Sequence, residues 1–196
     1  MLPGSVHSSF RDSLFRGRYR LLLGSGISMG ATNLGDEKLR SAWELTRDLC
    51  KRRNVPETSL SRVTKSLSPE IIKSEITDHY SLVEPSLAHT LMPKFLWHEI
   101  FTFNVDDGIQ RAYEKAPRVL QSLIPKNFPE VFSGNSSRTQ VPLIHLHGCV
   151  RWPGAGYVFS INDYAQISAE TNPWMVYLAD SVTAFRLGSH RSPFFG

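Results

Sequence analysis

Apolar residues recur along the first part of the chain with two spacings, one typical of helices and one of strands. Apolar side chains at every fourth position predict a short amphipathic helix over residues 6–15, closed by Gly17. An apolar run of strand length follows at once over residues 19–23 and stops at a glycine-rich loop. The chain therefore opens with a helix, a strand and a tight loop.

Two further helices are predicted by their first residues. Ser41 can cap a helix whose apolar positions fall on one face, and Trp43 is expected to add a bulky side chain to the core. Ser68 can cap a second helix, because Pro69 after it is tolerated at the first helical position. Both starts place the capping hydroxyl directly before the helix.

Helix-like and strand-like segments continue to alternate in the second half. Residues 87–96 have helical spacing, residues 100–103 are strand formers that lead into a polar loop, and residues 109–115 return to a helical pattern. Residues 143–146 predict another buried strand, ending at His147.

The segments around this last strand have weaker patterns. Pro125, Pro129 and the small polar residues 134–137 predict a loop-rich excursion over the surface. Residues 157–159 predict one more short strand before a helix that contains Tyr164.

This alternation predicts the fold class. Strands that alternate with helices favour a Rossmann-like α/β three-layer sandwich with a mostly parallel sheet, here as a single domain over residues 1–196. Such sheets bind ligands at the carboxyl ends of their strands. Three unusual loops are expected there, at residues 24–28, 104–107 and 147–148.

The first of these loops has the composition of a phosphate-binding turn. Gly24 and Gly26 allow positive φ and a close approach of backbone N–H groups to a pyrophosphate. A Gly-Ser-Gly sequence can equally be a plain turn, and Ser28, Met29 and Gly30 break the rhythm of the usual dinucleotide fingerprint.

The second loop carries amide and carboxylate groups. Asn104 offers a donor and an acceptor, which suits it to hold a ribose hydroxyl or an attacking water. Asp106 and Asp107 can bind hydroxyls or orient neighbouring groups. The alternative is structural, with Asn104 and Asp107 closing a turn and capping the next helix.

The third loop supplies a histidine. His147 can act as a general base, because an imidazole of ordinary pKa exchanges a proton near neutral pH. It can also be a structural residue. His145 lies two residues earlier, on the same face of an extended strand, and is a rival; its place inside the strand favours a core position.

Composition narrows the class of protein. The chain has 196 residues, 41% of them hydrophobic, which suffices for a substantial core. Cys50 and Cys149 lie far apart in the sequence, and neither has a second cysteine close to it, so neither a disulfide framework nor a zinc knuckle is expected. No apolar run reaches the length of a membrane span, and a cytoplasmic protein is expected. The net charge of +4 is dispersed, and nucleic-acid binding is unsupported.

The three loops in this order resemble the motifs of the sirtuin-like, or silent information regulator, domains. Residues 24–28 are similar to that family's Gly-Ala-Gly-Ile-Ser loop, residues 102–106 to its Thr-x-Asn-x-Asp motif, and residues 146–148 to its Leu-His-Gly motif. Ala88-His89, Trp97 and Asp163-Tyr164 are similar to flanking residues of the family. The resemblance spans residues 19–174 and is greatest to the branch found in prokaryotic anti-phage defence proteins.

The resemblance implies a role for each matching residue. Gly24, Ser25, Gly26 and Ser28 would bind the phosphates of NAD, with Thr102 and Asp106 supporting its ribose pocket. Asn104 would orient a water or the ribose, and His147 would be the general base. Asp107 has no assigned role.

The sequence lacks several motifs of the family's protein deacylases, and these differences favour one of the family's activities over another. The cysteine pairs that hold zinc in protein deacylases are absent, residues 29–35 lack the Phe-Arg pair of those enzymes, and Phe103 stands where they carry glutamine. The resemblance therefore favours an NAD hydrolase without a metal. The family's last pocket loop has only degenerate counterparts at residues 187–189 or 194–196, so a longer protein or a neighbouring subunit is expected to complete the pocket.

Two functions remain open from the sequence. The first is an NAD hydrolase that acts in anti-phage defence by depleting NAD and is activated by a partner protein or by oligomerisation. The second is a catalytically inactive nucleotide-binding or scaffolding module paired with a separate effector. Trp152 and Trp174 can serve an oligomer interface or the core, and the sequence does not choose between them.

Overall fold

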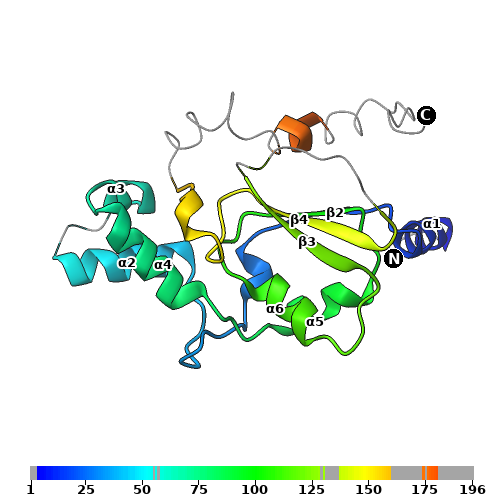
Figure 1. Cartoon of the computed structure of the whole chain (residues 1–196), viewed down its shortest axis with the longest axis horizontal. Coiled ribbons are helices and arrows are strands. Elements are labelled where there is room, and N and C mark those ends of the chain that lie inside the picture. Colours follow the sequence, from blue (N-terminus) through cyan, green and yellow to red (C-terminus); the bar gives the residue numbers. More distant parts are fainter. Residues whose placement is uncertain are drawn as a thin grey trace.

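A parallel sheet of four strands forms the centre of the molecule. The structure, a computed structural model, describes residues 4–54, 56, 58–128, 130, 137–159, 174 and 176–180. The strands are adjacent in the order β1-β2-β4-β3 and all pairs are parallel (Figure 1). Their bounds are β1 (Arg20–Leu23), β2 (Glu99–Thr102), β3 (Ser122–Asn127) and β4 (Gln140–His145).

Helical segments cover both faces of this sheet (Figure 1). On one face, Ile100 and Leu143 pack with residues of the 3-10 turn η2 (Met92–Lys94) and of α6 (Gly108–Lys115). On the other face, Phe101 and Ile144 pack against Trp174, in a helical segment that includes residues 176–180. Adjacent residues of a strand point to opposite faces, so both strands are buried on two sides. The expected three-layer α/β arrangement is confirmed.

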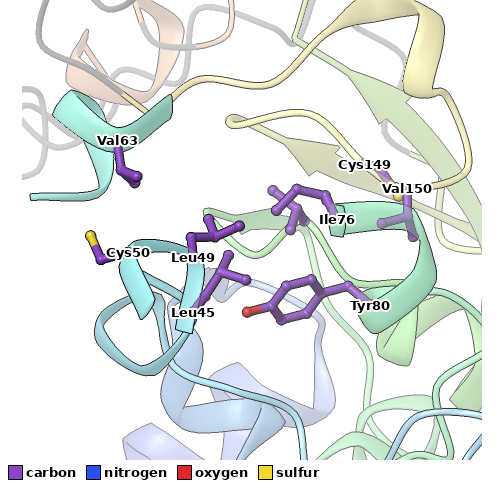
Figure 2. Close-up of a cluster of buried hydrophobic side chains, with 9 residues drawn as sticks. Leu45, Leu49, Cys50, Val63, Ile76, Tyr80, Cys149 and Val150 are labelled. Atoms are coloured by element: carbon purple, nitrogen blue, oxygen red, sulfur yellow. The ribbon is translucent and has the colours of Figure 1, made fainter. Parts of the chain in front are cut away.

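A lobe of three helices stands beside the sheet. It consists of α2 (Ala42–Arg53), α3 (Leu60–Lys65) and α4 (Pro69–Tyr80). Figure 2 shows its interior, where leucines of α2 meet Ile76 and Tyr80 of α4. Val105, Cys149 and Val150 belong to the same apolar cluster. The lobe is therefore anchored on the loops that follow β2 and β4, at the carboxyl edge of the sheet.

The capping residues begin the helices as the sequence predicts. Ser41 and Glu44 form a reciprocal capping box at the start of α2, and the Ser68 hydroxyl accepts a hydrogen bond from the Ile71 N–H at the start of α4. The first helix, α1 (Gly4–Phe15), ends just before Gly17, which has a φ of 64°. Between residues 87 and 96, a short helix α5 (Leu87–Leu91) continues into η2.

Three expectations about local structure are wrong. Trp43 is 61% exposed on the outer face of α2, where the Arg47 guanidinium lies 4.6 Å from its ring centroid. Pro125 lies inside β3 rather than in a loop; β3 ends the strand order, and an edge strand tolerates a residue without an N–H. Residues 157–159 form no strand, although the Val158 N–H donates to the His147 carbonyl.

No helix among the described residues is long and apolar enough to cross a membrane. Trp174 is 2% exposed and therefore belongs to the core in this structure, whereas the predicted helix around Tyr164 lies outside the described residues.

Gly148 is expected to be indispensable for the loop after β4. Its φ is +88°, and a Cβ there would lie 2.5 Å from the Gly156 carbonyl oxygen. Gly148→Ala should lower the free energy of unfolding by about 2 kcal/mol or more, since both backbone strain and a clash oppose it. Gly154→Ala is the control, because a Cβ at that position meets no atom within 4 Å. Urea unfolding followed by tryptophan fluorescence would measure both, and equal stabilities would contradict the prediction.

Candidate functional site

The register of the strands brings the predicted loops together. Leu23 is paired with Thr102, and Thr102 is paired with His145, so β1, β2 and β4 end at one level. The chain leaves β1 through the 3-10 turn η1 (Ser25–Ser28). Because adjacent parallel strands end side by side, the loops after them start as neighbours.

Asn104 is held by four hydrogen bonds. Its side-chain Nδ2 donates to Ser28 Oγ at 2.8 Å and to the Gly24 carbonyl at 3.2 Å. Its backbone N–H donates to Thr102 Oγ1 at 3.0 Å, and its carbonyl accepts from His145 Nδ1 at 3.1 Å. Both the position and the orientation of the amide are therefore fixed by the ends of all three strands.

Asp106 lies beneath this amide. The carboxylate is buried, with Oδ2 accepting from Ser28 Oγ at 2.7 Å and Oδ1 accepting from the Gly108 N–H at 2.9 Å. Burial raises the pKa of Asp106, and the Ser28 hydroxyl and nearby His89 oppose that rise. The Ser28 hydroxyl donates to Asp106 and accepts from Asn104, so one side chain connects the first loop to the second.

The two histidines of the third loop have different surroundings. His145 is fully buried, with Nδ1 on the Asn104 carbonyl and Nε2 accepting from the Gln110 amide at 2.8 Å. Burial lowers its pKa to about 4, which keeps the ring neutral with the proton on Nδ1. Its expected core position is confirmed, and its role is to hold the Asn104 backbone.

His147 lies beyond the strand, in a turn, because β4 ends at His145. The sequence pattern predicts both histidine rings on one face, because side chains alternate along an extended strand. This alternation stops at His145, where β4 ends, and does not apply to His147. The His147 ring is half-buried and lies 4.8 Å from the ring of Phe103, centroid to centroid. Burial lowers the pKa of His147 to about 4, so its ring is neutral at neutral pH and is a weaker base than the imidazole of ordinary pKa that the sequence suggested.

The glycine loop is open on its outer side. A Cβ at either Gly24 or Gly26 would meet no atom within 4 Å, and Ser25 between them is exposed. Neither glycine has a positive φ, so the expected left-handed turn is absent. What the glycines provide is open space beside the backbone, rather than a special conformation.

Two further buried polar residues, Ser86 and His89, support the site from the start of α5. The sequence patterns did not identify them as supporting residues. The Ser86 hydroxyl donates to the Ile27 carbonyl at 2.7 Å, and Ser86 and His89 form a capping box at the start of α5. A Cβ on Gly108 would lie 2.8 Å from His89 Cε1 and 2.9 Å from Asp106 Oδ1. Only glycine at position 108 allows His89 and Asp106 to come this close. The Ser86–His89 pair could have been found from its Ser-x-x-His spacing, which is that of a capping box with histidine in place of the usual glutamate.

Asp107 has a structural role. Its Oδ1 accepts from the Val83 N–H at 3.0 Å, and its Oδ2 lies 3.3 Å from Arg151 Nε. Arg151 also pairs with Glu114 on α6. Asp107 thus ties three segments together beneath the site. It stands at the N-cap position of α6, but its side chain makes no capping hydrogen bond, so its structural role differs from the predicted helix cap.

The Ser28 hydroxyl is expected to be the group that stabilises this arrangement. Ser28→Ala leaves the buried Asp106 carboxylate without one hydrogen bond and should lower the free energy of unfolding by about 1–3 kcal/mol. Ser25→Ala, in the same loop but exposed, should change it by less than about 0.5 kcal/mol. Equilibrium urea unfolding by circular dichroism would compare them, and a Ser28→Ala protein as stable as the control would refute the role.

Stability should fall in acid because His145 is buried in its neutral form. Between the ordinary pKa of 6.5 and about 4, the unfolded chain binds a proton at His145 that the folded chain does not. The free energy of unfolding therefore decreases as pH falls, by about 2 kcal/mol between pH 7 and pH 5 from this residue. His145→Gln should remove that part of the pH dependence. Parallel stability curves for the two proteins would argue against it.

Comparison with known proteins gives a family match. Residues 98–190 match the family model described as SIR2-like domain, a segment that includes Asn104, Asp106 and His147 but not the glycine loop. A search of the curated proteins found no match. No group of three or more histidine, cysteine, aspartate or glutamate side chains that could hold a metal occurs among the described residues. Over the part that carries two of the three loops, the chain is similar to SIR2-like domains, and the match supports a sirtuin-like domain.

Proposed function

We propose that the protein hydrolyses NAD⁺ to ADP-ribose and nicotinamide. The observation that carries this proposal is the hydrogen-bonded unit of Asn104, Ser28 and Asp106 beside the turn that holds His147. The SIR2-like match over residues 98–190 is compatible with chemistry on NAD. NAD is the substrate here, and no metal is part of the proposal.

The reaction needs few groups from the protein. The bond between the ribose anomeric carbon and the nicotinamide nitrogen breaks, and its electron pair leaves with neutral nicotinamide. The oxygen of a water molecule forms the new bond to that carbon, and the proton it loses goes to His147. A fixed amide and a neutral imidazole are suited to orient that water and to accept its proton.

The rest of the site would position the substrate. Gly24, Ser25 and Gly26 have the open space that a pyrophosphate needs, while Ser28 and Asp106 lie deeper and hold Asn104 in place. Thr102 is fully buried, and its Oγ1 accepts from the Asn104 N–H. We therefore assign Thr102 and Ser28 to positioning Asn104 and the outer glycine loop to direct binding of phosphate.

One observation favours a second candidate, a nucleotide-binding module without turnover. Asn104 Nδ2 already donates to Ser28 Oγ and to the Gly24 carbonyl, and the low pKa of His147 makes it a weaker base than an ordinary imidazole. Such a site can bind a nucleotide without activating water. An inactive module would pair with a separate effector protein.

For the organismal role, we infer a cytoplasmic protein of anti-phage defence that depletes NAD when activated. Activation by a partner protein or by oligomerisation would explain how a cell tolerates an NAD hydrolase. The resemblance to the anti-phage defence branch of the family supports the inferred role in defence. The departures from the deacylase pattern, including Phe103 and the lack of cysteine pairs, support hydrolysis over deacylation.

The test is NAD⁺ consumption by the purified protein, with nicotinamide measured by chromatography. Asn104→Ala and His147→Ala should each reduce nicotinamide release by about 100-fold or more, because each removes a group that acts on the attacking water. Lys73→Ala, an exposed position on α4, is the control and should leave release unchanged. Circular dichroism would verify that all variants are folded.

The outcomes separate the two candidates. Release that survives both substitutions would exclude this site as the source of hydrolysis. Binding of NAD by calorimetry without nicotinamide release, repeated with the full-length protein and at high concentration, would favour the inactive module.

A further inference from the structure

A groove lies at the far end of α6 from the candidate site. It has a volume of about 620 Å³ and is bordered by Pro93 of η2, by Ala112 and Ala116 at the end of α6, and by Leu120. Asp106 and Gly108 lie at the start of the same helix, which has eight residues and is therefore about 12 Å long. The groove and the site are thus separate places on one helix.

The floor of the groove is apolar because of which residues end the helix. Ala112 and Ala116 are four residues apart, so their small side chains lie on one face and leave space above it. Pro117 prevents the helix from continuing, and the chain returns so that the Leu120 N–H donates to the Pro93 carbonyl at 3.2 Å. The hollow is therefore built by the fold itself.

Apolar side chains extend the surface beyond the groove. Leu87 is 78% exposed and Leu91 is 42% exposed on α5, next to Thr90, which borders the groove. Positions 87, 90 and 91 share one helical face. Leu120 is 46% exposed on the other side. Exposed apolar side chains beside an apolar hollow are typical of a surface that binds another protein.

The rim of the groove is cationic. Lys94, Lys115 and Arg118 border it. Lys115 pairs with Glu84, whereas Lys94 and Arg118 make no ion pair with any residue that the structure describes. Two uncompensated cations beside an apolar floor are complementary to apolar side chains flanked by carboxylates.

We propose that this groove binds a segment of a partner protein in which apolar side chains are flanked by aspartate or glutamate. The apolar residues would occupy the hollow over Ala112 and Ala116, and the carboxylates would pair with Lys94 and Arg118. The proposal does not rest on NAD hydrolysis, because the groove shares no lining residue with the candidate site.

The experiment is selection of binders from a display library of random short peptides on the immobilised full chain. Selected sequences should share apolar residues flanked by carboxylates, and their affinity should fall as salt is added. Lys94→Glu and Arg118→Glu should each weaken a synthesised consensus peptide by about tenfold, since each replaces an attraction by a repulsion. Lys73→Glu, the same change on exposed α4, should not.

A second substitution tests the hollow without changing the rim. Leu120→Ala should weaken the peptide while circular dichroism and thermal unfolding remain near those of the parent protein. The proposal would be overturned if the selected peptides share no consensus or share one without carboxylates. It would also be overturned if none of the groove substitutions changes the affinity for the consensus peptide. Self-association in sedimentation velocity that Lys94→Glu abolishes would instead assign the surface to a second copy of the chain.

Discussion

The candidate site depends on one hydroxyl. Ser28 donates to the buried carboxylate of Asp106 and accepts from the amide of Asn104, and in doing so joins the loop after β1 to the loop after β2. The parallel register places these loops side by side, and the Asn104 side chain also donates to the Gly24 carbonyl at 3.2 Å. The hydrogen bond through Ser28 is what turns neighbouring loops into a fixed arrangement of polar groups.

Burial sets the electrostatic character of this arrangement. It raises the pKa of Asp106 and lowers the pKa values of His89, His145 and His147. The same physical cause has different consequences, because the groups differ in what they contact. His145 uses both ring nitrogens within the protein and holds a backbone carbonyl, whereas His147 lies in a turn beyond the strand and is half-buried. Only the ring of His147 is partly exposed to solvent.

The helix α6 connects two surfaces of different character. Its first residue, Gly108, packs so closely against His89 and Asp106 that no side chain fits there, while at its other end Ala112 and Ala116 line a groove with a cationic rim. Glycine at one end and alanine at the other serve opposite purposes: the first brings polar groups together, and the second leaves space between elements. A ligand at each end would contact the same rigid element without competing for residues.

The sequence by itself determined the parallel α/β class, the starts of α2 and α4 and the loops that carry the polar residues, because capping residues and apolar periodicity are local signals. It predicted a buried Trp43 and a loop at Pro125, and both predictions were wrong, because they depend on which helix face is covered and which strand lies at an edge. The sequence already favoured a core position for His145. Only the tertiary structure showed that its ring holds the Asn104 carbonyl and revealed Gly108 beside His89, since those contacts join residues distant in the chain. The polar residues of the candidate site can be identified from the sequence. The contacts that hold each of them in place depend on the packing of residues that are distant in the chain.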